Sequence, residues 1–455
     1  MIAPARLAAY RALLTVTTGQ ADLAVALARA RDVLQDERDR ALAGEIAIGS
    51  LRWQGASDHV IASFAGRSVS RLDVEVLTIL RLSIFQLLHL DRVPAAALVN
   101  DAVELARKAG KRSAAGFVNA LLRRVSRERL RLPLPSPPSD PSSARDAAID
   151  YLSITLSHPR WLIERWLDRY GYDATIEWAR FNNAAAPLVL RVNTLAMTRE
   201  AVASALQAAG VETEPTRSAS EGLIVKSGNP LLTPLAHKGW FVVQDEASQL
   251  VGEFVDARPG ERIFDACASP GGKTTQMAAA MHDEGRIIAA DVRGRRVDLL
   301  ARTVREVGAR SVRIVQADAR ASLPLREASL DAVLIDAPCS GLGTIRRDPD
   351  IRWRRTEVEL GSLASAQQEM LERASTLVRS GGRIIYATCS SEPDENEAVV
   401  DAFLASHPDF TLESSGPPSL AAVLDARGFL RTLPFRHGLE AFFAARLLKW
   451  GHSRF

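Results

Sequence analysis

The sequence has little cysteine and no long apolar run. Only Cys267, Cys339 and Cys389 occur among its 455 residues, an odd and sparse set that excludes a disulfide framework. No CxxC pair is present, so we expect no metal site. Unbroken apolar stretches of about 18 residues, the length that spans a membrane, are missing, and Arg6 and Arg11 interrupt the apolar pattern at the N-terminus without a signal-peptide cleavage signature. We therefore expect a soluble, cytoplasmic protein.

The positive charge is unevenly distributed along the chain. The net charge is only +3, but residues 1–150 hold 21 Lys and Arg against 16 Asp and Glu. Clusters of basic residues suit a polyanion such as nucleic acid, although solvated helix faces give the same pattern. Two such clusters are present: Arg107, Lys108, Lys111 and Arg112, and Arg123, Arg124, Arg127, Arg129 and Arg131.

A proline-rich segment divides the chain. Residues 1–131 place apolar side chains at helical spacing, for example over 74–90 and 96–109, and are predicted to form an all-helical domain. Residues 132–144 contain five prolines and four serines, which predicts an extended linker. Residues 145–240 are predicted to form an intermediate module, with helix over 145–183, strands over 188–194 and 222–227, and a helix over 199–209.

Residues 241–455 show short apolar runs that alternate with helical stretches. Continuous apolar strands linked by helices predict a parallel, doubly wound α/β sheet of the Rossmann-like class. In such a sheet, ligands bind beyond the carboxyl ends of the strands. The predicted strands are 262–267, 286–291, 312–318, 331–337 and 382–389.

The first of these strands runs into the sequence DACASPGGKT, residues 265–274. Gly271 and Gly272 let the backbone turn tightly and open a helix whose N-terminus favours negative charge. A phosphate-binding P-loop would need a glycine five positions before Gly272, where Cys267 stands, so that alternative is disfavoured. The sequence also has no GxGxxG, which disfavours a dinucleotide.

Acidic residues end the next two predicted strands. Asp291 is placed to receive ribose hydroxyls, and Asp318 is placed to accept a hydrogen bond from an adenine amino group. A single aspartate at a strand end is often only a helix cap, but acids in register at successive strand ends favour a cofactor. An adenosine with an amino-acid tail, S-adenosylmethionine, fits this pattern.

The last two predicted strands end in an acid and two thiols: Asp336 with Cys339, and Cys389. Carbon 5 of cytosine becomes nucleophilic enough to attack a sulfonium once a thiolate has added to carbon 6 and an acid faces nitrogen 3. Asp336 is the natural acid, and either thiol could be the nucleophile. A methylase acting on an exocyclic amine would be expected to carry a Pro-Pro-aromatic turn where this sequence has Ala-Pro-Cys. We therefore predict methylation at carbon 5.

An arginine-rich segment follows, with five arginines around Trp353 in residues 345–355. Guanidinium groups beside a tryptophan suit phosphate contacts and base stacking in RNA. A solvated loop and helix start would account for the same residues.

These residues resemble those of the bacterial 16S ribosomal RNA cytosine-5 methyltransferase B family, the Sun/Fmu group, essentially from end to end. The helical domain is similar to the NusB-type RNA-binding domain, including FVNALLRR at 117–124. The intermediate module resembles that of the family at 190–193 (LRVN) and 244–248 (QDEAS). The most specific motifs are DACASPGGKT, DAPCSGLGTIRRDPDIRW and TCSSEPDENE.

The resemblance implies a role for each site residue. Cys389 would be the nucleophile, and Cys339 would assist product release. The partner would be 16S ribosomal RNA, free or partly assembled, and we expect a monomer. The resemblance implies contacts to S-adenosylmethionine from Cys267, Ala268, Ser269, Pro270, Gly271, Gly272, Lys273, Asp291, Asp318 and Asp336.

Two departures from the family pattern are visible: Ser269 replaces the usual alanine, and Glu440-Ala441 replaces Asp-Gly. Three alternatives stay open: another ribosomal or transfer RNA cytosine as target, an inactive RNA-binding factor, and a DNA cytosine methylase. The intact thiols weigh against the second, and the lack of an added target-recognition insertion weighs against the third.

Overall fold

The structure, a computed structural model, describes residues 2–91, 93–141 and 143–450. The chain divides into two compact units. The helical unit comprises Met1–Ala185 and Ile345–Glu357, and the sheet unit comprises Ala186–Thr344 and Val358–Phe455. The chain therefore enters the helical unit a second time at residue 345. No described helix is long and apolar enough to cross a membrane.

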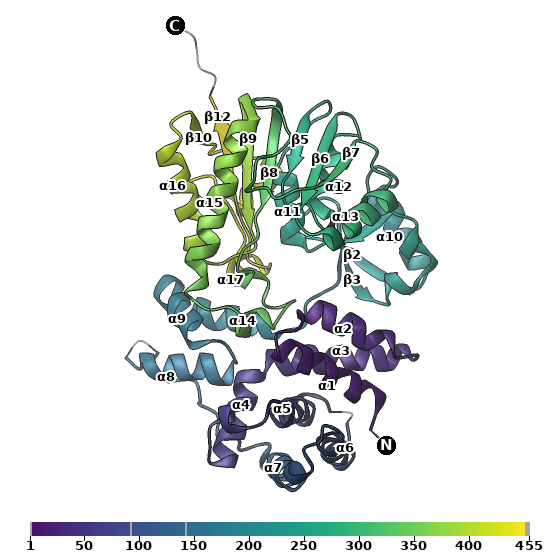
Figure 1. The fold of residues 1–455 in the computed structure, drawn as a ribbon, viewed down its shortest axis with the longest axis vertical. Coiled ribbons are helices and arrows are strands. Elements are labelled where there is room, and N and C mark those ends of the chain that lie inside the picture. The colour runs from purple at the N-terminus through teal and green to yellow at the C-terminus, as the bar shows by residue number, and fades with distance from the viewer. Residues whose placement is uncertain (1, 92, 142, 451–455) are drawn as a thin grey trace. The chain divides into compact units, whose positions relative to one another are not determined.

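The helical unit is organised around α5, Val74–His89, which confirms the helix predicted over 74–90. Ten of its sixteen residues are buried, as expected for a helix that is apolar on most sides. Its neighbours α1, α3, α4, α6 and α7 surround it (Figure 1). The α-helices of this unit are α1 Pro4–Thr17, α2 Leu23–Asp32, α3 Glu37–Arg52, α4 Gln54–Ala65, α5, α6 Ala95–Lys108, α7 Ala115–Glu128, α8 Arg145–Asp150, α9 Arg160–Asn183 and α14 Ile351–Arg354.

The predicted linker is extended but packed. Apart from residue 142, which lies outside the described residues, residues 132–144 form no helix or strand. Leu132 and Leu134 pack against the core of the helical unit. The following helices belong to this unit as well, since Gly55 of α4 donates its N–H to the Ser157 hydroxyl at 2.8 Å. The predicted boundary at residue 144 therefore does not separate the two units, which divide at residue 185.

A small antiparallel sheet opens the sheet unit, in the order β2-β3-β1-β4. The predicted strands and helix correspond to β1, β3 and α10, whereas β2 and β4 were not predicted. Because β4 pairs with β1, this sheet extends past the predicted limit at residue 240. The bounds are β1 Val189–Val192, α10 Arg199–Ala208, β2 Glu212–Pro215, β3 Gly222–Ser227 and β4 Phe241–Val243.

The main sheet confirms the doubly wound prediction and adds an antiparallel edge. Figure 1 shows its strands in the order β10-β12-β9-β8-β5-β6-β7. The five predicted strands, β5 to β9, are parallel, whereas the unpredicted β10, β11 and β12 pair antiparallel. The bounds are β5 Arg262–Asp265, β6 Arg286–Asp291, β7 Val312–Gln316, β8 Leu330–Asp336, β9 Val378–Thr388, β10 Phe410–Leu412, β11 Leu430–Arg431 and β12 Phe443–Lys449.

Side chains on alternate faces of the main sheet belong to two separate cores. Ile263 and Leu334 pack on one face with residues of α11, α12 and α13, while Phe264 and Val333 pack on the other with residues of α15 and α16. Helices on both faces explain why the parallel strands are apolar throughout. These helices are α11 Glu246–Phe254, α12 Gly272–Ala280, α13 Gly294–Val307, α15 Glu359–Leu377 and α16 Glu397–Ser406.

The arginine-rich segment lies in the helical unit, and its central residues are structural. Arg352 is fully buried and donates to the carbonyl of Ser157 at 2.7 Å and to that of Asn182 at 3.4 Å. Trp353 donates its ring N–H to the carbonyl of Leu51 at 2.6 Å. Leu51 and Asn182 lie at the C-terminal ends of α3 and α9, where helices leave carbonyls unpaired, and Ser157 lies in the turn before α9. The prediction of an RNA phosphate contact is therefore wrong for Arg352, which is fully buried, whereas contacts from the half-buried Trp353 and the other arginines stay predictions.

This arrangement makes Arg352 a test of the helical unit's stability. Arg352→Ala would leave buried carbonyls without donors, and we expect the free energy of unfolding to fall by about 3 kcal/mol or more. Urea unfolding followed by circular dichroism measures the loss. The matched control is Arg107→Ala on α6, whose exposed guanidinium pairs with the exposed Glu104 at 2.5 Å and should cost less than about 1 kcal/mol. Equal losses in the two variants would contradict the structural role.

Candidate active site

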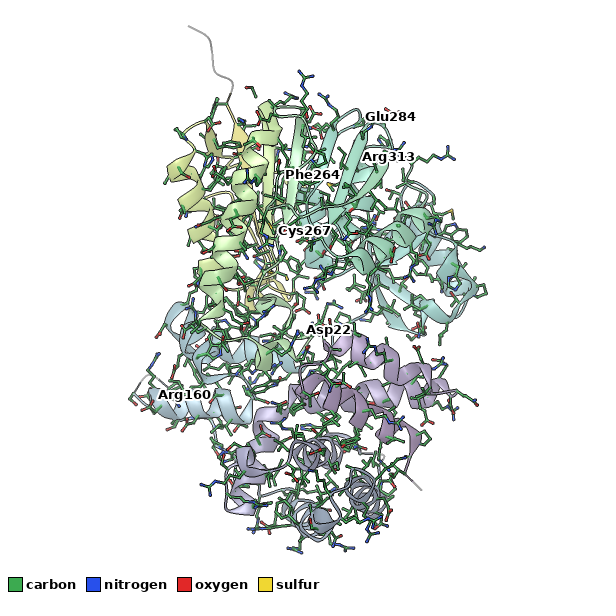
Figure 2. The ribbon with its side chains drawn as sticks, viewed as in Figure 1. Asp22, Arg160, Phe264, Cys267, Glu284 and Arg313 are labelled. Atoms are coloured by element: carbon green, nitrogen blue, oxygen red, sulfur yellow. The ribbon has the colours of Figure 1, made fainter. Side chains whose placement is uncertain are left out.

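A cavity of about 440 Å³ opens beyond the carboxyl ends of β5 and β8. The strand order reverses between these strands, which is where doubly wound sheets bind ligands. Figure 2 shows Cys267 just past β5, at the opposite edge of the sheet from Glu284 and Arg313. Residues from both sheets line the cavity: Leu231, Ala236, Phe241, Val242, Val243, Gln244, Asp245, Ser248, Asp265, Cys267, Ala268, Ser269, Pro270, Gly272, Lys273, Thr303, Glu306, Asp336 and Phe442.

The loop from β5 to α12 forms one wall of this cavity. Gly271 has a φ of +106°, and a Cβ there would lie 3.0 Å from the Leu300 side chain, so the turn requires glycine. Ser269, which replaces the family's alanine, donates its hydroxyl to the carbonyl of Arg296 at 3.0 Å. Seven of the ten predicted cofactor residues line the cavity: Cys267, Ala268, Ser269, Pro270, Gly272, Lys273 and Asp336.

Asp291 and Asp318 are not among the lining residues. Asp291 ends β6, is buried, and accepts a hydrogen bond from the N–H of Arg293 at 3.2 Å. Asp318 lies two residues past the end of β7 and pairs with Arg320 at 2.9 Å. The hydrogen bonds from Arg320 lower the pKa of Asp318. Contacts from these two acids to a cofactor stay predictions.

Lys273 and Asp336 form an ion pair in the cavity wall, with 2.7 Å between Nζ and the carboxylate. Burial alone lowers the pKa of Lys273, but the charge and hydrogen bond of Asp336 outweigh burial, so the pKa is raised above its usual value. Lys273 is therefore a cation at neutral pH. Cys389 adds to this effect, which means that the positive charge also acts on the Cys389 sulfur.

The two predicted catalytic thiols meet. The sulfur atoms of Cys339 and Cys389 are 3.2 Å apart, because β8 and β9 are parallel neighbours whose ends are in register at Asp336 and Ala387. The hydrogen bond with Cys389 and burial raise the pKa of Cys339 well above its usual value, and the charge of Glu395 adds to them. Cys339 therefore keeps its proton at neutral pH.

The third cysteine, Cys267, has an unreactive thiol. Burial raises the pKa of the Cys267 thiol, and the nearby carboxylates of Asp265, Asp336 and Asp291 raise it further. A thiol that resists ionisation is a poor nucleophile, so Cys267 contributes to the cavity wall and not to attack. Among the described residues, no group of three or more His, Cys, Asp or Glu is placed to hold a metal ion.

Arg191 is a residue at this site whose role the sequence did not reveal. It is fully buried in β1 and donates to Gln244 at 2.8 Å, to the Thr275 hydroxyl at 2.8 Å and to the carbonyl of Gly272 at 3.3 Å. The small sheet is thereby fixed to the first turn of α12, which carries the cofactor loop. Two signals in the sequence pointed to it: an arginine inside an otherwise apolar strand, and its place in the family-like string LRVN at 190–193.

Comparisons with known proteins agree along the whole chain. Family models described as 16S rRNA methyltransferase RsmB/F, as the NusB family and as the Methyltr_RsmF/B-like ferredoxin-like domain match residues 253–448, 3–127 and 158–231, respectively. A probable ribosomal RNA small subunit methyltransferase B of Synechocystis sp. is 34% identical, covering 90% of this chain and 91% of the relative. The ribosomal RNA small subunit methyltransferase B of Pseudomonas putida is 32% identical, covering 99% of each.

Solved structures agree as well. The crystal structure of PH0851 superposes with a TM-score of 0.82 at 29% identity, covering 99% of each chain. The sheet, the cavity and the thiol pair define a Rossmann-like methyltransferase. With relatives at 32–34% identity over most of its length, the chain belongs to the RsmB/F family of 16S rRNA methyltransferases.

The buried carboxyl of Asp265 gives this site a measurable pH dependence. Burial raises the pKa of Asp265 to about 7, although the Thr274 hydroxyl, 2.7 Å away, offsets part of the effect. Because the unfolded chain titrates near pH 4, the stabilisation from protonated Asp265 is complete below that pH and is lost as the pH rises through about 7.

We therefore expect the wild type to lose stability relative to Asp265→Asn as the pH rises from about 4 to about 7, and the difference to level off above that. The difference should change by up to about 1.4 kcal/mol per pH unit, the slope for one proton. Asparagine can still accept the hydrogen bond from Thr274 and does not titrate. Urea unfolding of both proteins at four pH values measures the difference, and a difference independent of pH would show that Asp265 does not titrate in this range.

Proposed function

We propose that this chain transfers the methyl group of S-adenosylmethionine to carbon 5 of a cytosine in 16S ribosomal RNA, with Cys389 as the nucleophile. The observation that carries the proposal is the pair of thiols 3.2 Å apart at the ends of β8 and β9, one of them within the influence of a buried lysine. Membership in the RsmB/F family supports the RNA substrate. We further expect a cytoplasmic monomer that acts on free or partly assembled RNA.

The cavity fits the proposed cofactor. Its volume of about 440 Å³ lies in the usual range for small-molecule sites. Asp265 lines it with one buried carboxylate oxygen that has no hydrogen bond to a described residue, an acceptor suited to a donor on a ligand. The backbone of Cys267–Gly272 would hold the amino-acid end, and Asp291 and Asp318 would hold the ribose and adenine. When bound, S-adenosylmethionine supplies an electrophilic methyl group.

The side chains divide the remaining chemistry among them. The Cys389 thiolate adds to carbon 6 of the cytosine, and the electrons of the C5–C6 double bond move toward nitrogen 3. Nitrogen 3 takes a proton that the Lys273 ammonium passes through the Asp336 carboxylate, to which it donates at 2.7 Å. Carbon 5 is then nucleophilic and receives the methyl group.

Product release reverses the addition. Water takes the proton from carbon 5, the electrons of that C–H bond re-form the C5–C6 double bond, and the bond from carbon 6 to the Cys389 sulfur breaks. Nitrogen 3 returns its proton through Asp336 to Lys273. The protonated Cys339 thiol, 3.2 Å from that sulfur, is placed to donate a hydrogen bond to the departing thiolate. Cys339 therefore serves the second half of the reaction and Cys389 the first.

Substitution of each thiol separates these roles. Cys389→Ala should abolish methylation and leave no covalent RNA adduct, because the carbon 5 nucleophile no longer forms. Cys339→Ala should still attack but release slowly, so an enzyme–RNA adduct should accumulate. Denaturing gel electrophoresis detects the adduct, and bisulfite sequencing of 16S RNA detects the product.

The reverse pattern would overturn the assignment. An adduct in Cys389→Ala and none in Cys339→Ala would make Cys339 the attacking thiol. Full methylation of 16S RNA by Cys389→Ala would exclude the covalent route.

The basic cluster on α7 and just after it is the proposed source of RNA affinity. Arg123, Arg127 and Arg131 are exposed in the structure. Removing residues 1–131 would take away the core against which Trp353 packs, so charge reversal is the cleaner test. Replacing these three arginines with glutamate should weaken RNA binding and flatten its dependence on salt, by about 0.7 in the log–log slope for each RNA phosphate that the variant no longer neutralises.

A matched triple reversal controls for net charge. Arg286, Arg310 and Arg313 are exposed at the starts of β6 and β7, and Figure 2 shows Arg313 at the opposite edge of the sheet from Cys267. Their replacement with glutamate should leave the salt slope close to that of the wild type. Equal slopes in all three proteins would assign the helical unit another role.

A further inference from the structure

One buried carboxylate joins the two turns that carry the thiols. Glu395 is fully buried, and one of its oxygens accepts the backbone N–H of Ser340 at 2.8 Å. Its other oxygen accepts the hydroxyl of Ser390 at 2.6 Å. Ser340 directly follows Cys339, and Ser390 directly follows Cys389. Glu395 is thus the bridge between the two turns.

Other buried polar groups hold the bridge in place. The Gln367 amide of α15 donates to Glu395 at 3.1 Å and to the carbonyl of Pro338 at 3.1 Å. The hydroxyls of Ser340 and Ser390 lie 3.1 Å apart. All of these side chains except that of Pro338 are buried. A buried network with its partners in place is rigid, because any displacement leaves a polar group unpaired.

The Glu395 bridge fixes the distance between the two sulfur atoms, which the sheet alone does not determine. Strand register brings the ends of β8 and β9 together, but each sulfur lies on a turn beyond its strand. The distance of 3.2 Å between the sulfur atoms therefore depends on the conformation of both turns. Glu395 contacts both turns at the residue next to each cysteine, so it fixes them relative to one another.

The same carboxylate distinguishes the two thiols electrostatically. Cys339 is flanked by Glu395, by Cys389 and by the buried phenol of Tyr386. Burial, with Cys339 and Glu395, raises the pKa of Tyr386, which is therefore neutral. Lys273 places positive charge near the Cys389 sulfur. Negative charge beside Cys339 raises the pKa of that thiol and disfavours its ionisation.

We propose that Glu395 is the positioning residue of this active site, which holds the two thiols at their working distance and keeps Cys339 protonated so that Cys389 attacks first. The assignment of Cys389 as the attacking thiol rests on the proposed function. The placement of Glu395 between the two turns does not.

Thiol alkylation tests the electrostatic part without RNA or cofactor. Iodoacetamide reacts with the thiolate, so the rate at each cysteine, read by mass spectrometry of its peptide, follows that thiol's ionisation across pH. Glu395→Gln keeps the shape of the side chain and removes its charge. Alkylation of Cys339 at pH 8 should become faster than in the wild type, because removing the Glu395 charge lowers the pKa of Cys339. Glu392→Gln is the matched control, since Glu392 is also buried on this segment but bonds to Ser391, and Cys339 should then react as in the wild type.

Methyl transfer tests the positioning part. Glu395→Asp keeps the charge but is one methylene too short to reach both turns, so kcat should fall at least tenfold while the alkylation profile of Cys339 stays near that of the wild type. Ser390→Ala removes only one of the two bonds and should lower kcat with little effect on KM for S-adenosylmethionine. These two variants decide the question if Glu395→Gln fails to fold.

Two results would overturn the inference. The electrostatic part fails if a folded Glu395→Gln alkylates Cys339 at the wild-type rate. The positioning part fails if Glu395→Asp and Ser390→Ala both retain wild-type kcat. A failure of the proposed function is distinct from either result. It would appear as methylation by Cys389→Ala, whereas the alkylation rates of Cys339 test the role of Glu395 whether or not the proposed function holds.

Discussion

The parallel order of β5, β8 and β9 brings the reactive groups of this chain together. Because neighbouring parallel strands end at the same edge of a sheet, Asp265, Asp336 and Cys389 lie at one edge although many residues separate them in sequence. The cavity opens where the strand order reverses, and the thiols meet one turn further along. Every chemical role proposed for these side chains depends on that shared edge.

Buried charged side chains then fix the relative positions of segments that the sheet brings only near one another. Arg191 ties the small sheet to the start of α12, Arg352 donates to carbonyls in the turn before α9 and at its C-terminal end, and Glu395 joins the thiol turns. Burying a charge costs free energy, and such groups often add little net stability. Their value here is geometric, because each contacts two separate segments and loses hydrogen bonds if either moves.

The sequence predicted the features that are encoded locally. Apolar runs located the five parallel strands, and the segment 265–274 supplied seven of the nineteen residues that line the cavity. The resemblance identified the thiol pair. Strand β2 was missed because its residues are mostly exposed and do not alternate, and β12 was missed because its antiparallel pairing depends on distant partners.

The sequence could not predict side-chain roles that depend on contacts with residues far away in the chain. Arg352 and Trp353 look like an RNA contact because their acceptors, at Leu51, Ser157 and Asn182, lie more than 150 residues away. Likewise, the string TCSSEPDENE contains several acids, and nothing local indicates that Glu395 is the one buried between two turns.

The central claim is that Cys389 bonds covalently to carbon 6 of a cytosine in 16S ribosomal RNA. The most direct measurement uses RNA that carries 5-fluorocytosine, since fluorine on carbon 5 cannot be removed as a proton and elimination is blocked after methyl transfer. Mass spectrometry of the digested complex should then show the modified nucleotide on the peptide containing Cys389. A nucleotide attached to Cys339, or methyl transfer to unmodified RNA with no trapped complex on the fluorinated RNA, would contradict the account.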